Sequence, residues 1–338
     1  MRDNMGEIKP SFDEKRQKLG DILPLDTPFN VLIDSSEACN FRCQYCFRAN
    51  KDKSVWGYAE KCNMMDWETF IKVVEQIKEF PQPVKQISLS VHGEPLCNKQ
   101  IPDMVQYIKR AGIESRISMH TNASLLNKEY VEKLVESQID RIVVSLQGLN
   151  AEKYERVCGI RIDYSSFYSN LKLLSERKHE STQLHIKIAD AALEPGEEKI
   201  FYDQYRPIAD RVYIEKIVPI WKNTDNSIKQ GIHQNKYGEC FPEQNCCPVL
   251  FHTIVVTPSG DVYPCTQLLY PKPLGNVHDM SLQQIWNSEQ RKKLLRTQLQ
   301  RKSMDICKDC YIKTNSIFTA EDLIDQYSDE VLNRMDNA

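Results

Sequence analysis

Apolar and polar positions form two repeating patterns over the first two thirds of the chain. Six short segments with apolar centres have the length of buried strands: 30–34, 86–91, 115–119, 141–146, 184–189 and 212–217. The segments between them place apolar residues at helical spacing: 66–80, 101–111, 128–136, 151–157, 165–176 and 197–205. Strands that alternate with helices in this way predict a parallel sheet with right-handed crossovers.

The last third of the chain has a different pattern. Two apolar segments, 251–257 and 261–263, flank Pro258-Ser259-Gly260, which predicts a β-hairpin. Residues 281–299 predict one helix with Ser281 as its cap, and 319–335 predict an acidic amphipathic helix. We therefore expect an N-terminal extension (1–29), a first domain (30–218), a polar linker (219–237), a second domain (238–315) and a C-terminal helix (316–338).

Charge and composition exclude several classes of protein. The 338 residues include 44 Lys and Arg against 47 Asp and Glu, a net charge of −3, so no global basic field indicates a nucleic-acid partner. No apolar run approaches the ~18 residues of a membrane helix. The N-terminal residues lack the apolar core of a signal peptide. We therefore expect a cytoplasmic protein with neither a nucleic acid nor a membrane as partner.

The chain contains twelve cysteines, clustered towards both ends. A reducing compartment disfavours disulfides, so this clustering indicates metal binding. Cys39, Cys43 and Cys46 form a C-x3-C-x2-C array. Three soft thiolates suit three corners of a [4Fe–4S] cluster and leave the fourth iron open for a substrate or a second cofactor. A structural zinc knuckle, or three cysteines that are neighbours by chance, is the alternative interpretation.

The aromatic Tyr45 gives this array the form C-x3-C-x-aromatic-C. It resembles the signature of the radical S-adenosylmethionine (SAM) enzymes. The resemblance implies that the open iron binds the amino and carboxylate groups of SAM, and that the reduced cluster cleaves SAM to a 5′-deoxyadenosyl radical. It also implies an α/β fold, a partial (β/α)6 TIM-like barrel with a small C-terminal α+β iron–sulfur domain. In barrels of this type the chemistry collects at the C-terminal ends of the strands.

The sequence H-G-E-P at 92–95 follows the second expected strand. It resembles the G-G-E-P motif of the family, which holds the methionine amino group of SAM. The resemblance assigns this role to Gly93 and Glu94, and a carboxylate suits an ammonium partner. His92 replaces the first glycine of the motif. The alternative interpretation of this segment is an ordinary turn between a strand and a helix.

Two further motifs follow the third and fourth expected strands. H-T-N-A at 120–123 resembles the T-N-G turn of the family, which places Thr121 and Asn122 at the SAM site. S-L-Q-G at 145–148 resembles S-I-D-G, which implies that Ser145 contacts the ribose of SAM. Gln147 stands where the family often has Asp. Taken singly, each motif is equally compatible with polar groups that only end a strand.

The sequence Y-E-R-V-C-G at 154–159 resembles the family's Y-x-x-I-R-G, with Cys158 in place of the arginine. The resemblance then leaves the contact to SAM to Arg156 or Arg161. Cys158 has two interpretations, a hydrogen-atom donor at the mouth of the active site or a small packing residue.

A second group of cysteines combines Cys247-x17-Cys265 with Cys307-x2-Cys310. Together with G-D-V-Y-P-C at 260–265 and G-N-V-x4-L-x2-I-W at 275–286, it resembles the SPASM/twitch extension of radical SAM enzymes. No cysteine follows Cys310, so the resemblance favours the twitch form, with one auxiliary [4Fe–4S] cluster in an electron-transfer role. A four-cysteine zinc site is the alternative. Other cysteines that compete as ligands or serve in packing are Cys240, Cys246, Cys62 and Cys97.

The first functional hypothesis is oxidation of a small polar metabolite, most simply a sugar or aminocyclitol alcohol. It rests on similarity to twitch-type aminocyclitol dehydrogenases, in which the auxiliary cluster takes the second electron. Candidate bases on the fifth and sixth strands are Lys187, His185 and Lys216. The family is typically reduced by a flavodoxin or ferredoxin, and we expect such a partner here.

Three alternatives stay open. A redox-neutral epimerase of a sugar or aminoglycoside needs a hydrogen donor, for which Cys158 is the candidate. A peptide- or protein-modifying enzyme is less favoured, because only 38 residues precede Cys39, too few for the leader-binding domain of many such enzymes. A non-catalytic iron–sulfur or zinc scaffold is disfavoured by the intact Glu94 and the three clustered cysteines.

Overall fold

One open β-sheet organises the molecule. The computed structural model describes residues 16–220, 234–302, 304–308 and 310–337. Its strands lie in the order β6-β5-β4-β3-β2-β1-β7-β8-β9. The sheet is not closed, because β6 and β9 remain as its two edges. This is the partial barrel expected from the sequence.

The first six strands are parallel and lie in sequence order. Their bounds are β1 Asn30–Ile33, β2 Gln86–Ser88, β3 Arg116–Thr121, β4 Arg141–Leu146, β5 Gln183–Ala189 and β6 Arg211–Glu215. The six predicted strands are therefore confirmed, although β2 is shorter than expected. Beyond Ser88 the Ser90 hydroxyl, rather than a backbone carbonyl, accepts the His120 N–H at 2.8 Å. All six strands end on the side of the sheet where the motif residues lie.

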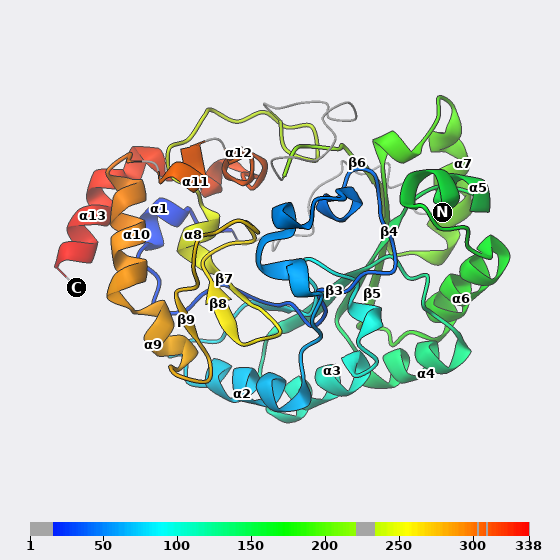
Figure 1. The fold of residues 1–338 in the computed structure, drawn as a ribbon, viewed down its shortest axis with the longest axis horizontal. Helices are drawn as coiled ribbons and strands as arrows, with labels where there is room; N and C mark the ends of the chain where they lie inside the picture. Colours follow the sequence, from blue (N-terminus) through cyan, green and yellow to red (C-terminus); the bar gives the residue numbers. More distant parts are fainter. Residues whose placement is uncertain (1–15, 221–233, 303, 309, 338) are drawn as a thin grey trace.

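The predicted helices between the strands are also confirmed. They are α2 Trp67–Ile77, α3 Ile101–Arg110, α4 Lys128–Ser137, α5 Ala151–Cys158, α6 Tyr164–Arg177 and α7 Glu197–Tyr205. Asp66 caps α2 by accepting the Thr69 N–H at 2.8 Å. Figure 1 shows α2, α3, α4 and α6 in an arc along the outside of the sheet. Short 3₁₀ helices lie in the connections: η1 Phe47–Ala49, η2 Lys53–Lys61, η3 Pro95–Cys97, η4 Asp190–Ala192 and η5 Arg206–Ile208.

The second domain continues the sheet of the first. Its strands are β7 Thr253–Val256, β8 Asp261–Tyr263 and β9 Gly275–Asn276. β7 is parallel to β1, with pairs from Asn30↔Thr253 to Ile33↔Val256. β8 returns antiparallel to β7, as the hairpin signal predicts. Gly260 in this turn has φ +82°, a backbone conformation that favours glycine.

The helix predicted over 281–299 is two helices, so this expectation was wrong. α9 Leu282–Trp286 ends early, and α10 Glu289–Leu299 starts afresh. The break occurs because Ser288 caps α10 and accepts the Arg291 N–H. The predicted cap at Ser281 is confirmed and forms a capping box with Gln284.

The continuous helix predicted over 319–335 was also wrong in its first half. Two 3₁₀ turns, η7 Ala320–Asp322 and η8 Asp325–Tyr327, precede α13 Ser328–Asp336. Asp322 accepts the Phe318 N–H at 2.9 Å, and Asp325 accepts the Asn245 N–H at 2.7 Å. These two carboxylates bind neighbouring backbone N–H groups, so they are not part of a helix face.

Two expectations fall partly on residues outside the described ranges. Residues 1–15 of the expected N-terminal extension and 221–233 of the expected linker lie there. The end of the linker returns to the sheet, because the Lys216 N–H donates to the Lys236 carbonyl at 2.8 Å. Four short helices complete the described chain: α1 Leu19–Ile22, α8 Val249–His252, α11 Asp305–Lys308 and α12 Ile312–Asn315.

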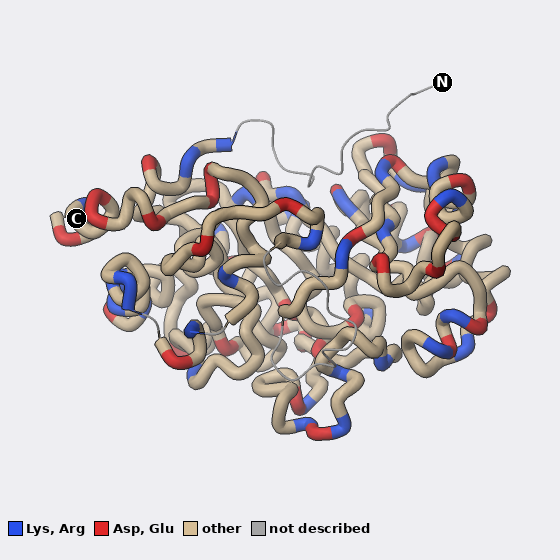
Figure 2. The backbone as a smooth tube through the Cα atoms, turned by 90° about the horizontal axis from the view of Figure 1, so that it is seen from above, with Lys and Arg blue, Asp and Glu red and all other residues tan. Residues whose placement is uncertain are grey.

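Buried apolar side chains of the described residues form one large cluster, a smaller one, and a third of four residues around Phe47 and Trp56. The large cluster lies between the sheet and the helices that cover it. The smaller one brings α1, α10 and α13 together near Cys247 and Cys265, at the left of Figure 1. Figure 2 shows blue and red segments interleaved along the chain rather than one charged face. Among the described helices, none combines the length and the apolar composition needed to cross a membrane.

Candidate active site

A cavity of about 320 Å³ lies at the C-terminal ends of the parallel strands. Residues that follow β1, β2, β3 and β4 line one part of it, and residues of β5 and β6 line another. Side chains at these strand ends converge because parallel strands deliver their carboxyl ends to the same edge of a sheet. The cavity has the size of ordinary small-molecule sites.

Cys39, Cys43 and Cys46 all line this cavity, in the loop that follows β1. The loop is held by backbone bonds, including one from Cys46 N–H to the Cys43 carbonyl at 2.8 Å. Phe41 is buried beneath it and packs edge-on against Tyr154. Burial raises the pKa of the Cys46 thiol to about 11. A bound metal would reverse this, because a coordinating thiol is deprotonated.

The segment 92–95 is clamped directly to the cysteine loop. The Glu94 N–H donates to the Ala38 carbonyl at 2.8 Å. A Cβ at position 93 would overlap the carbonyl oxygens of Ser36 and Ala38, so only glycine fits there. His92 has no positive φ, which explains how a histidine replaces the first glycine of the motif.

Glu94 is the centre of a hydrogen-bond network at the cavity wall. Its carboxylate accepts the Asn122 N–H at 2.7 Å and the hydroxyl of Thr121. Asn122 in turn donates to the Asn40 side chain at 2.9 Å, next to Cys39. Burial raises the pKa of Glu94 to about 7, although these hydrogen bonds act to lower it. The Leu96 N–H donates a third bond at 3.1 Å, and since a carboxylate has about four acceptor positions, Glu94 retains one for an ammonium ligand.

Unpaired polar atoms lie at the same cavity. Among the described residues, the buried Tyr45 hydroxyl and Gln147 Oε1 have no hydrogen-bond partner, and both residues line the cavity with Ser145. Buried polar groups without partners are uncommon and often mark a missing ligand. Three cysteines, a glycine cradle, a buried carboxylate and two orphaned oxygens together fit an iron–sulfur cluster with a polar cofactor beside it.

A second group of cysteines lines a separate small cavity. Cys247, Cys265, Cys307 and Cys310 surround it. Cys246 instead turns away, with Sγ 3.3 Å from the Gln298 carbonyl. In the part of the chain that the structure describes, no three Cys, His, Asp or Glu side chains converge as ligands of a single ion. Four thiols around one cavity are a ligand set that suits an iron–sulfur cluster or a single zinc ion.

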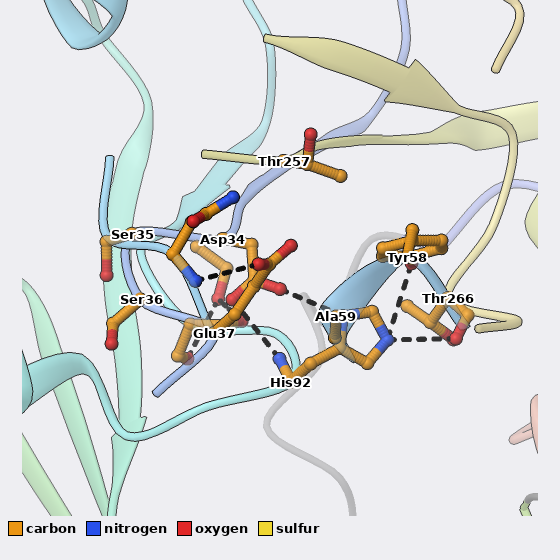
Figure 3. Close-up of polar contacts among 12 residues, drawn as sticks. Asp34, Ser35, Ser36, Glu37, Tyr58, Ala59, His92, Thr257 and Thr266 are labelled. Atoms are coloured by element: carbon orange, nitrogen blue, oxygen red, sulfur yellow. Dashed lines mark hydrogen bonds and ion pairs between the residues drawn. The ribbon is translucent and has the colours of Figure 1, made fainter. Parts of the chain in front are cut away.

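A buried polar cluster, which we call the histidine cluster, joins the two cysteine regions. It consists of Asp34, Glu37, Tyr58, His92 and Thr266 (Figure 3). His92 Nδ1 lies 2.9 Å from Asp34 Oδ2, and His92 Nε2 lies 3.0 Å from the carbonyl of Thr266. Since Thr266 follows Cys265, this contact links the loop before Glu94 to the second cysteine cavity.

Two family models match this chain, one over each group of cysteines. The sequence model of the radical SAM superfamily matches residues 33–188, from the end of β1 to the end of β5. The model of an iron–sulfur cluster-binding domain, SPASM, matches residues 246–311. The chain carries a radical SAM domain and a SPASM domain. Its two matched domains imply a SAM-binding [4Fe–4S] cluster and an auxiliary [4Fe–4S] cluster, as the sequence motifs predict.

Relatives with this domain pair have diverse names. The chain is 24% identical over 338 aligned residues to the tungsten-containing aldehyde ferredoxin oxidoreductase cofactor-modifying protein of Pyrococcus furiosus, covering 89% of this chain and 92% of the relative. Streptococcus suis SuiB bound to S-adenosylmethionine has a TM-score of 0.64 at 18% identity, covering 92% of this chain and 79% of SuiB. BtrN in complex with AdoMet and 2-DOIA has a TM-score of 0.52 at 17% identity, covering 83% and 92%. At these identities the two solved structures show a shared fold.

Three residues assigned by the radical SAM resemblance are not brought to the cavity. Arg156 pairs with Glu194 at 2.7 Å, and Arg161 pairs with Glu155 at 2.9 Å, both on the surface. Cys158 is fully buried in the core beneath the cysteine loop, and its thiol donates to the Tyr154 carbonyl at 2.8 Å. The packing interpretation of Cys158 therefore fits the structure better than a hydrogen-donor role.

The three candidate bases of the radical SAM barrel occupy different places. Lys187 and Lys216 line the cavity. His185 lies on the same strand as Lys187 but outside the cavity lining, and it is fully buried. Burial and the neighbouring Arg141 lower the pKa of His185 to about 4. His185 is therefore a neutral core residue rather than part of the cavity wall.

Sequence reasoning missed four charged or titratable residues at the cavity: Arg48, His120, Glu215 and Lys236. Glu215 Oε2 lies 2.5 Å from Lys187 Nζ, and Glu215 Oε1 lies 2.7 Å from Lys236 Nζ. Burial alone would raise the pKa of Glu215, but the two lysines outweigh it and lower this pKa to about 2. The position of Glu215 at the end of a predicted strand was the available signal. Lys236 lay in the expected linker, where no local pattern marks it.

Proposed function

We propose that this radical SAM enzyme oxidises a sugar- or aminocyclitol-type alcohol, or a similar small polar metabolite, in the central cavity. The observation that carries the proposal is one cavity that Cys39, Cys43 and Cys46 line together with Lys187 and Glu215. A substrate between them would touch both the SAM site and a basic group. When bound, the cluster and SAM supply a 5′-deoxyadenosyl radical that removes a hydrogen atom from carbon.

The residues of the SAM side divide into two sets. Cys39, Cys43 and Cys46 would hold the cluster. The SAM itself would lie against Gly93 and Glu94, with further contacts from Tyr45, Thr121, Asn122 and Ser145. The orphaned Tyr45 hydroxyl and the free capacity of the Glu94 carboxylate support this division.

Oxidation of an alcohol to a carbonyl also requires loss of the hydroxyl proton and of one electron. Lys187 is the base that the geometry favours, because it lines the cavity and is only partly exposed. Burial lowers the pKa of Lys187, although Glu215 opposes this effect, so more of its amine is in the neutral form that can accept a proton than in an ordinary lysine. Lys216 is exposed, and it keeps the role of the second candidate.

The electron requires an acceptor, and the second cysteine cavity is the place where one would be held. Cys247, Cys265, Cys307 and Cys310 supply four sulfurs around it. A redox-neutral epimerase would instead need a hydrogen donor in the central cavity, and Cys158 lies in the core. This difference favours oxidation over epimerisation. A flavodoxin or ferredoxin-type protein would supply the reducing electron for SAM cleavage.

The test is an iron count and a 5′-deoxyadenosine assay on anaerobically reconstituted protein. We expect about 8 iron atoms per chain, and about 4 in a Cys39/Cys43/Cys46→Ala triple variant that releases no 5′-deoxyadenosine. Cys247→Ala should also retain about 4 iron atoms, while its neighbour Cys246→Ala is the matched control and should keep about 8. A parent with about 4 iron atoms and a triple variant with none would remove the auxiliary electron acceptor and place epimerisation first.

A further inference from the structure

Three lysines and one carboxylate line the cavity on the side away from the cysteine loop. We call this set the lysine wall: Lys187, Glu215, Lys216 and Lys236. If all are charged, three positive groups face one negative group. The lysines come from the ends of β5 and β6 and from the segment that returns after residue 233. Nothing in the radical SAM motifs accounts for this concentration of charge.

The wall is built by contacts that fix the lysines side by side. The backbones of Lys216 and Lys236 are joined by a hydrogen bond of 2.8 Å. Glu215 holds Lys187 and Lys236 at its two oxygens, at 2.5 and 2.7 Å. The Lys216 stem runs over Gly238, where a Cβ would lie 3.1 Å from Lys216 Cε. Lys216 Nζ meets the neutral side chain of Gln234 at 3.4 Å.

Among the residues that the structure describes, the lysine wall has more positive than negative groups. One carboxylate compensates one lysine, and the other lysines border a partly enclosed space. A surplus positive charge near low-dielectric walls raises the local concentration of anions and costs free energy when it has no partner. Loss of the Lys187 proton would remove one charge, which agrees with the lowered pKa of this lysine. Lys216 and Lys236 would still outnumber Glu215.

We infer that the substrate carries an anionic oxygen group, a carboxylate or a phosphate, bound by Lys216 and Lys236. This inference rests on the proposed function, because it takes the central cavity to be the substrate site. Lysine is suited to such groups as a point charge with three donors. An anion anchored there leaves Lys187 next to the middle of the cavity and directs the rest of the substrate towards the cysteine loop.

The test is isothermal titration calorimetry of the reconstituted holoenzyme with SAM, using inorganic phosphate and succinate as separate probes and myo-inositol as a neutral probe. We expect at least one anion to bind and the neutral probe not to bind. Lys216→Met and Lys236→Met should each weaken anion binding about tenfold, which corresponds to about 1.4 kcal/mol. Lys172→Met, an exposed lysine on α6 outside the cavity lining, is the matched control and should bind like the parent.

The substitution Glu215→Gln should change the affinity for anions in the opposite direction. It removes the competing carboxylate, so anion binding should tighten, whereas a purely structural role would weaken it. The inference is overturned if neither anion binds, if the lysine variants bind like the parent, or if Glu215→Gln weakens binding as they do.

Release of 5′-deoxyadenosine from the same samples separates the two proposals. Release without lysine-dependent anion binding overturns only the anionic-substrate inference. No release from any sample overturns the proposed function.

Discussion

The histidine cluster and the lysine wall each combine acids and bases, but they differ in how their charges are compensated. In the histidine cluster, the side chains of His92 and Asp34 are almost fully buried and paired at 2.9 Å. The opposite ring nitrogen of His92 meets the Thr266 carbonyl (Figure 3). The lysine wall borders a cavity and has more lysines than carboxylates. The first arrangement joins loops, whereas the second can receive a ligand.

The same difference predicts different effects of substitution. A buried pair that has lost one partner leaves an uncompensated group in the protein interior. A group that faces a cavity can instead be met by water or by a ligand. Substitutions in the histidine cluster should therefore act on folding, and substitutions in the lysine wall should act mainly on binding and turnover.

The largest effect is expected for Asp34→Ala. It leaves the Nδ1 of the buried His92 without its carboxylate and removes an acceptor of the His92 N–H. We expect the free energy of unfolding to fall by about 3–5 kcal/mol. Urea denaturation of the apo chain measures this. A loss below about 1 kcal/mol would mean that the buried His92–Asp34 pair contributes little to stability, and it would end the comparison.

The next effect concerns turnover rather than stability. Lys187→Met should lower the rate of substrate oxidation by about 100-fold or more, because a positioned base contributes about that much. 5′-Deoxyadenosine should still be released although little oxidised substrate forms, because the residues on the SAM side of the cavity are unchanged. Chromatographic assay of both products measures the split. If 5′-deoxyadenosine release falls in parallel with oxidation, Lys187 supports the SAM site and is not the base.

The smallest effect is a change in the pH dependence of stability at Glu215. The lysines lower its pKa to about 2 in the folded chain, from an ordinary value of 4.5. Its stabilising contribution is therefore complete above pH 4.5 and is lost as the pH falls towards 2. Glu215→Gln should be less stable than the parent by about 2 kcal/mol at pH 6, with the difference shrinking below pH 4.5. Thermal unfolding between pH 3 and 7 measures this, and a pH-independent difference would contradict the assigned pairing.

Local signals in the sequence were enough to predict one part of the site. Each of three features is encoded by residues that are neighbours in the sequence: the strand β1, the array at Cys39 and the segment at Glu94. Parallel strands bring those stretches to one edge of the sheet. The contact between the Asn122 N–H and the Glu94 carboxylate, at 2.7 Å, could therefore be expected from the order of the motifs. Spacing alone did not separate Cys246 from Cys247, and the structure places Cys247 in the lining of the second cysteine cavity and Cys246 beside the Gln298 carbonyl.

The rest of the site could not be predicted from motifs, because it depends on side-chain direction and on tertiary contacts. Arg156 and Arg161 lie near the family position in the sequence, but side-chain direction placed both in surface ion pairs. Lys236 reaches the cavity only through a backbone contact with Lys216, across residues whose composition indicated a linker. The lysine wall is therefore a product of tertiary structure, and no single segment of the sequence contains its pattern.

The pairing of β1 with β7 also has a consequence for biosynthesis. Asn30 pairs with Thr253, so one edge of the first strand has no neighbour until more than 220 residues have followed it from the ribosome. At about 5–20 residues per second this interval lasts roughly 10–45 s. An unpaired strand edge is a template for aggregation during that time. Yield of the native chain should therefore depend on chaperone capacity and on translation speed across the second domain, even where every residue of the catalytic cavity is unchanged.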